Sequence, residues 1–381
     1  MPFFDGRQNP PHPLAGKAQL QVSVRPVRRM LHATALSALL SWLGCAVLIL
    51  LGRRRHFGLD ETVGIQKWHR QPTPRTGGFA IAAGLLLGLL WLMHLAYVPA
   101  AEMGFVSVAL LPVLLAGGVE DVRRHVPPLW RALATLLAAT LAVSLLGASV
   151  HRVGLWPLDA WLQTWPWLGA MAAVIAIGAL PHAVNMIDGY NGLAGVVSFM
   201  IFGALGYVAF KVSDALIMAL SLAAIGSLLG FLFWNWPRGQ IFLGDTGAYL
   251  LGFWMALLAV LLVARNAAVS PWFALLVLAY PVWELLYSLW RRKFRKRAGT
   301  APDTLHLHHL VYWRLTRLLD EHPDPRQRRN AATSPYLWAV AAFSVGPAML
   351  WWNNTAVLML CCVAFVTLYL LAYRLLVQRR I

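Results

Sequence analysis

The sequence predicts an all-helical integral membrane protein with about eleven transmembrane helices. Two observations predict this fold class. Of the 381 residues, 59% are hydrophobic and only 12% are charged, whereas soluble domains carry about 25% charged residues. The apolar residues also gather in long runs, with most Lys and Arg in the loops between them, as in inner-membrane proteins. The net charge of +17 therefore does not indicate a nucleic-acid partner.

Apolar runs of roughly 17–25 residues can cross about 30 Å of hydrocarbon as helices. The first run ends at Arg53, Arg54 and Arg55 without a small-residue cleavage site, so we expect a retained span. Residues 1–30 are an N-terminal extension, and residues 31–381 form a single membrane domain with a basic polar loop at about 291–334. The predicted spans are 31–52, 77–97, 104–119, 129–149, 166–184, 192–211, 214–235, 246–264, 271–290, 335–352 and 355–376.

The distribution of Lys and Arg predicts the orientation of the chain. Apart from those in the N-terminal extension, nearly all Lys and Arg residues lie in the loops that follow the odd-numbered spans and in the C-terminal tail. The positive-inside rule places these segments, and the C-terminus, in the cytoplasm. The extension would then lie outside although it is basic, so it is either an amphipathic surface segment or it precedes the true start. Its basic residues are Arg7, Lys17, Arg25, Arg28 and Arg29.

Five unusually polar motifs all fall on the predicted cytoplasmic side. A channel or transporter needs polar groups along a path through the bilayer, whereas here the acidic residues are expected only at the ends of spans. This asymmetry favours a reaction at one membrane face. The motifs are KWHRQPTPRTGG (67–78), GGVEDVRRHVPP (117–128), NMIDGYNGLAG (185–195), IFLGDTGAYLLG (241–252) and DTLHLHHL (303–310).

Three acidic sites in these motifs are candidates for catalysis. Each has a purely structural alternative: the Glu120–Asp121 pair as a helix end with a local ion pair, Asp188 as an Asx turn, and Asp245 as a helix-capping charge. All three lie beside glycines, which allow a close approach of the backbone. We therefore expect Asp121, Asp188 and Asp245 to converge on one divalent ion.

The chemistry that suits such a cluster is metal-dependent phosphoryl transfer. Mg²⁺ prefers one or two carboxylates plus phosphate oxygens, and nearby basic side chains bind the remaining phosphate charge. The run RRKFRKR (291–297) is instead expected to be a topology anchor at anionic lipid. The histidine motif lacks further zinc-ligand spacing, and in a helix His306 and His309 would share a face. The candidate basic residues are Lys67, His69, Arg70, Arg75, His306, His308 and His309.

The order of these motifs, from about residue 60 to residue 309, resembles the polyprenyl-phosphate N-acetylhexosamine-1-phosphate transferases. This family includes the bacterial enzymes that start O-antigen and teichoic-acid linkage units, and the translocase that makes lipid I. NMIDGYNGLAG is the most specific of the motifs. The resemblance implies undecaprenyl phosphate and a UDP-N-acetylhexosamine as substrates and Mg²⁺ as cofactor, with Mn²⁺ as the alternative ion.

The resemblance also implies roles for individual residues. Asp121 would be the carboxylate that activates the lipid phosphate, with Glu120 as its partner, and Asp188 a second acid with a catalytic and metal-binding role. Asp245 would bind Mg²⁺. Substrate binding would fall to Lys67, His69, Arg75, Asn185, Asn191, His306, His308 and His309.

Three departures from the family pattern qualify these roles. Glu120 stands where the family usually has Asp, and Asn191 where it often has a second Asp, so Asn191 would be a hydrogen-bond partner rather than a strong ligand. The motif HLHH, in place of HHH, favours the simpler UDP-N-acetylhexosamine branch over the pentapeptide branch that forms lipid I.

The expected activity is transfer of N-acetylhexosamine-1-phosphate to undecaprenyl phosphate with release of UMP. It would start a lipid-linked surface polysaccharide, such as the O-antigen of lipopolysaccharide, in the bacterial inner membrane, and the family suggests a homodimer. The competing hypotheses are a transporter or flippase of lipid-linked glycans, the lipid I-forming branch, and a non-catalytic membrane scaffold.

Overall fold

A computed structural model describes residues 14–55, 58–60, 72–124, 126–294, 305–316 and 325–378. These residues are almost entirely helical, and the predicted all-helical fold class is confirmed. Two short antiparallel strands pair Leu59–Asp60 (β1) with Thr73–Pro74 (β2). The helices are α1 (Leu14–Arg55), α2 (Gly77–His94), α3 (Ala100–Arg123), α4 (Pro128–Leu146), α5 (Trp156–Thr164), α6 (Pro166–Ile187), α7 (Leu193–Lys211), α8 (Ala215–Asn235), α9 (Gly244–Arg265), α10 (Pro271–Val277), α11 (Ala279–Phe294), α12 (Leu307–Arg314), α13 (Pro325–Leu350) and α14 (Thr355–Gln378).

Within the described ranges, nine helices are long and apolar enough to cross a membrane: α1, α2, α3, α4, α6, α7, α8, α9 and α14. Helices α10 and α11 form a tenth candidate, bent by 72°. Pro281 in the first turn of α11 has no N–H to donate, which favours a break in the helix there. The predicted span at 335–352 falls in α13, which is not among these candidates and contains Pro335 and Pro347.

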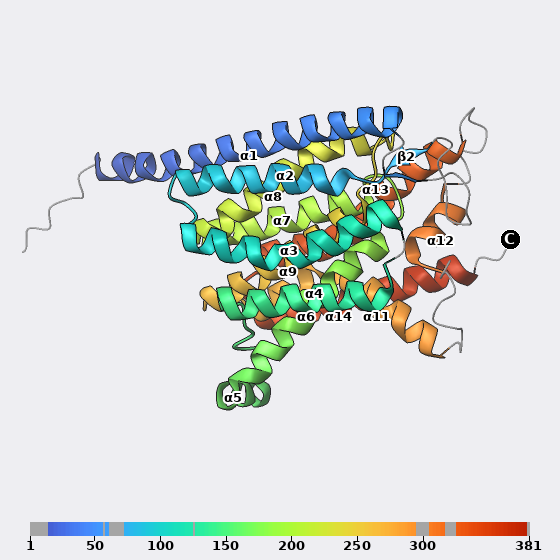
Figure 1. The fold of residues 1–381 in the computed structure, drawn as a ribbon. Helices are drawn as coiled ribbons and strands as arrows, with labels where there is room; N and C mark the ends of the chain where they lie inside the picture. Colours follow the sequence, from blue (N-terminus) through green and yellow to red (C-terminus); the bar gives the residue numbers. More distant parts are fainter. Residues whose placement is uncertain are drawn as a thin grey trace, which may run out of the picture.

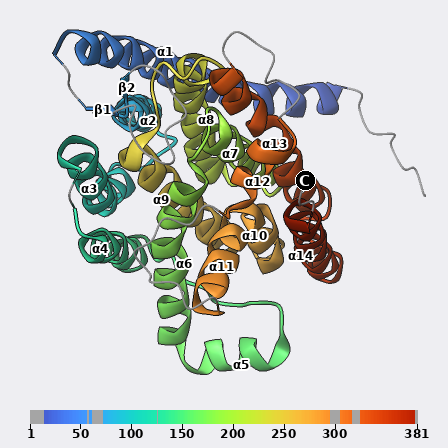
Figure 2. The same ribbon diagram turned by 90° about the vertical axis from the view of Figure 1, so that its right-hand side faces the viewer.

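Helix α9 is the axis of the bundle. Nearly every side chain from Gly244 to Leu262 is buried, because α9 packs against α2, α3, α6 and α7. A helix that is apolar on all sides is expected at the centre of such a bundle. Figures 1 and 2 show the other long helices around it, with α1, α2 and α8 on one side and α4, α6 and α11 on another.

The segments predicted to share one membrane face lie at one end of the bundle. Helices α3, α6, α8, α11 and α14 end there, and α4, α7, α9 and α13 begin there, next to α12 and the strands (Figure 1). At the opposite end, α5 runs across the direction of the long helices (Figure 2). Trp156 and Trp161 of α5 are 84% and 62% exposed, as is typical of tryptophans at a membrane interface.

Candidate active site

A cavity of about 670 Å³ opens at the end of the bundle where the polar motifs gather. It brings together side chains from all five motifs, which are remote in the sequence, because their helices begin or end at this level. Lys67 and His69 lie outside the described residues. The predicted site residues that line the cavity are Arg75, Asn185, Asp188, Asn191, Asp245, His306, His308 and His309.

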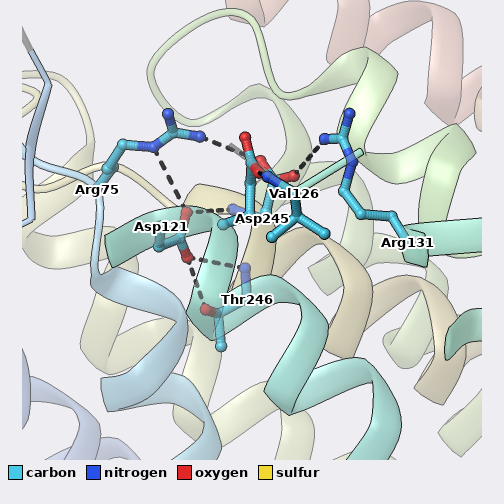
Figure 3. Close-up of polar contacts among 7 residues, drawn as sticks. Arg75, Asp121, Val126, Arg131, Asp245 and Thr246 are labelled. Atoms are coloured by element: carbon cyan, nitrogen blue, oxygen red, sulfur yellow. Dashed lines mark hydrogen bonds and ion pairs between the residues drawn. The ribbon is translucent and has the colours of Figure 1, made fainter. Parts of the chain in front are cut away.

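Asp245 lies in the first turn of α9, between two guanidinium groups (Figure 3). One carboxylate oxygen accepts a hydrogen bond from Nη2 of Arg75 and the other from Nη1 of Arg131, both at 3.1 Å. Burial opposes the charge of Arg75, but Asp121 and Asp245 outweigh it, so the pKa of Arg75 is raised. This end of the cavity therefore combines a carboxylate with two permanent cations, and guanidinium groups are well suited to bind phosphate oxygens.

Asp121, at the end of α3, is completely buried behind the cavity and does not line it. One carboxylate oxygen accepts the backbone N–H of Asp245 at 2.8 Å. The other accepts the backbone N–H and the hydroxyl of Thr246, at 2.9 and 2.6 Å (Figure 3). Because the first N–H groups of a helix have no partner within it, Asp121 caps α9 and fixes Asp245. This geometry supports a positioning role, while direct activation of substrate by Asp121 stays a prediction.

Glu120 has a similar local role. Its side chain is half-buried, and Oε2 accepts the backbone N–H of Val126 at 2.8 Å. This bond holds the connection between α3 and α4, and Glu120 is not among the side chains that line the cavity. The predicted catalytic role of Glu120 likewise stays a prediction.

Gly244 allows Asp121 and Arg75 to reach the start of α9. Its φ is +72°, and a Cβ there would lie 2.0 Å from the carbonyl oxygen of Arg75 and 2.7 Å from both carboxylate oxygens of Asp121. Gly244→Ala is therefore expected to destabilise the protein by at least about 1–2 kcal/mol, measured as a lower melting temperature in detergent. Gly203→Ala is the control, because no atom lies within 4 Å of its added Cβ. Equal melting temperatures for the two variants would contradict the close approach.

Asp188 faces the same cavity from the C-terminal end of α6. Burial, and then the charge of Asp245, raise the pKa of Asp188 to about 7, although Arg75 acts in the opposite direction. Two carboxylates that disfavour each other's charge are a fitting environment for a divalent cation. However, no three His, Cys, Asp or Glu side chains in the described part of the chain are arranged to hold a metal. Hydrogen bonds to α9 occupy both oxygens of Asp121, so the expectation that Asp121 shares an ion with Asp188 and Asp245 stays a prediction.

The loop after Asp188 is held by side chains of α8 and α13. The N–H of Asn191 donates to Oδ1 of Asn330 at 2.8 Å, and its carbonyl accepts the hydroxyl of Ser334 at 2.6 Å. The N–H of Gly192, which has φ of +76°, donates to Oδ1 of Asn235 at 2.7 Å. The side chain of Asn191 lines the cavity and donates from Nδ2 to the carbonyl of Pro237 at 3.3 Å, and its predicted role as a hydrogen-bond partner of the substrate stays a prediction.

The three histidines form one cluster at the start of α12. The ring centroids of His308 and His309 are 4.3 Å apart, and those of His306 and His308 are 5.2 Å apart. All three side chains are buried and line the cavity. Burial, and then the neighbouring His309 and His306, lower the pKa of His308 well below its usual value. His308 is therefore a neutral hydrogen-bonding group rather than a cation at pH 7.

Several lining residues lie outside the motifs identified in the sequence. Arg131 comes from the first turn of α4, where a lone Arg at the start of an apolar run suggests only an interfacial charge. His182 lies in the predicted span 166–184, with Nε2 3.0 Å from the Thr135 hydroxyl oxygen. A histidine within an apolar run was the sequence feature that could have identified it as a site residue. Asn235 and Asn330, also outside the motifs, line the cavity as well, as does Tyr249 of the motif at 241–252.

Comparison with known proteins identifies the family of this chain. The sequence profile described as Glycosyl transferase family 4 matches residues 103–263. The chain is 30% identical, over 77% of each sequence, to a decaprenyl-phosphate N-acetylglucosaminephosphotransferase of Mycobacterium leprae. It is 29% identical to a probable undecaprenyl-phosphate N-acetylglucosaminyl 1-phosphate transferase of Bacillus subtilis, over 64% of this chain and 67% of that protein. The chain therefore belongs to glycosyl transferase family 4, as its resemblance to the polyprenyl-phosphate N-acetylhexosamine-1-phosphate transferases predicted.

Proposed function

We propose that this protein transfers N-acetylhexosamine-1-phosphate from a UDP-sugar to undecaprenyl phosphate and releases UMP. The observation that carries the proposal is the cavity in which Asp188 and Asp245 face the same space, beside Arg75 and Arg131. Two carboxylates with two guanidinium groups suit a metal-bound diphosphate. Because the cavity lies at one end of the bundle, a lipid phosphate could reach it while its chain stays among the lipids.

Asp188 and Asp245 are the residues that would hold Mg²⁺. A hard cation accepts one or two carboxylates and completes its shell with phosphate oxygens and water, so this all-oxygen pair fits without a third protein ligand. When bound, the ion would neutralise the donor diphosphate and orient it. Arg75 and Arg131, which pair with Asp245, are the cations positioned to bind the remaining phosphate oxygens.

The reaction exchanges one phosphoanhydride bond for another. An oxygen of the lipid phosphate attacks the phosphorus next to the sugar, and the bond from that phosphorus to the oxygen of UMP breaks. The leaving phosphate keeps the electron pair, and the products are UMP and a lipid-linked sugar diphosphate. Because the bonds broken and formed are alike, the reaction should be readily reversible. The neutral imidazole of His308 and the rings of His306 and His309 would form hydrogen bonds with the sugar and phosphate groups.

Removal of the metal should stop the reaction. Purified protein in detergent, incubated with undecaprenyl phosphate, Mg²⁺ and labelled UDP-GlcNAc, is expected to form labelled lipid and UMP. Excess chelator should reduce the rate to background, because the diphosphate charge is then not neutralised, and added Mg²⁺ should restore it; Mn²⁺ tests the alternative ion. Turnover that persists in chelator would contradict the metal site.

The same assay separates the competing hypotheses. A flippase would move lipid-linked glycan across the membrane of vesicles without forming UMP. A non-catalytic scaffold would neither move the glycan nor form UMP, whichever donor is supplied. A panel of UDP-N-acetylhexosamines that includes the pentapeptide-bearing donor distinguishes the simpler branch, which we favour, from the lipid I-forming branch.

We propose that the product starts a surface polysaccharide, such as O-antigen, at the cytoplasmic face of a bacterial inner membrane. A homodimer is part of this proposal and is tested by the mass of the protein in detergent.

A further inference from the structure

One acidic residue lies inside a membrane-spanning segment rather than at its end. Glu284 falls within the predicted span 271–290, in α11, and is 1% exposed. The expectation that acids occur only at span ends is therefore wrong at this position. A carboxylate in the middle of a span costs about 2.5–3.5 kcal/mol on insertion scales. Such a residue normally has a functional reason and identifiable partners.

The partners of Glu284 belong to α12 and α14. Its Oε1 accepts the backbone N–H of Leu307 at 3.0 Å, and Oε1 also lies 3.4 Å from Nδ1 of His306. Its Oε2 accepts the hydroxyl of Tyr369 of α14. Leu307 is the first residue of α12, and the preceding His306 makes no side-chain cap of its own. Glu284 thus satisfies from another helix an N–H group that would otherwise have no partner within α12.

Two further residues of α11 bind the same segment. Ser288, one turn after Glu284, has its hydroxyl 3.1 Å from Nδ1 of His306. Arg291 donates to the carbonyl of Leu305, which also accepts the hydroxyl of Tyr373 at 3.0 Å. Residues 284, 288 and 291 follow the helical i, i+4, i+7 spacing and share one face of α11. This polar face contacts the residues that lead into α12.

We propose that Glu284 is a positioning residue that holds the start of α12 and thereby places the histidine cluster in the cavity. Helix α12 has only eight residues, and so short a helix is unstable without tertiary contacts. The contact with Leu307 anchors its first turn. The contact with His306 directs Nδ1 toward α11, so the opposite edge of the ring, which carries Nε2, is the edge presented to the cavity. The importance of Glu284 for turnover rests on the function proposed above.

Amide hydrogen exchange of residues 305–316 tests the structural part of this proposal without any substrate. In Glu284→Ala, the N–H of Leu307 loses its acceptor, and exchange in this segment is expected to be roughly 10- to 100-fold faster. Glu284→Gln keeps an oxygen that can accept the bond and should retain most of the protection. Tyr369→Phe, which removes only the hydroxyl donor, should give a smaller increase in the exchange rate of this segment. It replaces Glu284→Ala as the test variant if Glu284→Ala does not fold.

Asp214→Ala is the matched control. Asp214 is also a buried acid that caps a helix, through Ile217 of α8, but it lies at the other end of the bundle, where it pairs with Arg265. Its loss should destabilise the protein without a selective change in residues 305–316. Unchanged exchange in that segment of Glu284→Ala, or an equal change in the control, would overturn the proposal.

Kinetics tests the functional part. With UDP-GlcNAc as donor, Glu284→Ala is expected to reduce kcat/KM by about 10- to 100-fold, and Glu284→Gln should recover part of that loss. Asp214→Ala should leave kcat/KM unchanged. If the wild-type protein transfers no sugar while the exchange result holds, the proposed function fails and the positioning of α12 stands. If Glu284→Ala loses exchange protection but keeps full kcat/KM, the histidine placement is not needed for turnover and that part of the proposal is wrong.

Discussion

Asp245→Asn is expected to reduce turnover by about 10³-fold while the protein remains folded. Asparagine has nearly the same shape, but its neutral amide cannot replace a carboxylate that pairs with two guanidinium groups and that, in the proposed function, would also bind a divalent ion. Loss of several kcal/mol of charge stabilisation in the transition state corresponds to this factor. The pairs with Arg75 and Arg131 are partly exposed, so their loss should change the free energy of unfolding by only about 1 kcal/mol.

The measurement is the rate of UMP release over a range of Mg²⁺ concentrations, with the melting temperature of each variant. Asp214→Asn, a buried acid at the opposite end of the bundle, is the control and should keep wild-type turnover. A rate within tenfold of wild type for Asp245→Asn at all Mg²⁺ concentrations would remove Asp245 from the proposed metal site.

Asp121→Asn is expected to lower both turnover, by about 10²-fold or more, and the melting temperature. A single amide oxygen cannot accept all three hydrogen bonds from Asp245 and Thr246, and the amide NH₂ would face a backbone N–H. A buried donor without an acceptor costs about 1–3 kcal/mol, and the first turn of α9 would shift together with the carboxylate of Asp245.

The two roles considered for Asp121 differ in this experiment. A positioning role predicts that stability and turnover fall together. A wild-type melting temperature with turnover abolished would instead support the role implied by the family resemblance, in which Asp121 activates the lipid phosphate directly. Near wild-type turnover would contradict both roles. Thr246→Val provides a matched comparison, because it removes only the hydroxyl bond and should have a smaller effect in the same direction.

Local sequence patterns were sufficient for most of the fold. The length and composition of apolar runs predicted the helices that became α1 to α9, apart from α5, because burial in lipid imposes a minimum length that is visible in the sequence. The break between α10 and α11 and the assignment of α13 as a span were less predictable. Prolines and tertiary contacts decide where such helices bend, and hydropathy does not report them.

The motifs also predicted which residues line the cavity, but not what each side chain contacts there. Asp188 and Asp245 face the cavity as expected. Asp121 does not, because the N–H groups of α9 occupy its carboxylate. Arg131 also belongs to the site, where it pairs with Asp245. In the sequence it is only a single charge at the start of an apolar run.

By itself, the sequence determined the class of protein, the approximate spans, the family and the gathering of the polar motifs at one end of the bundle, since hydropathy, charge and motif order are local properties of the chain. Only the tertiary structure decided that Asp121 supports Asp245 from behind, that Arg131 pairs with Asp245, and that Glu284 anchors the histidine helix. These roles depend on hydrogen bonds between residues from about twenty to more than a hundred positions apart, and such contacts leave no periodic trace in the sequence.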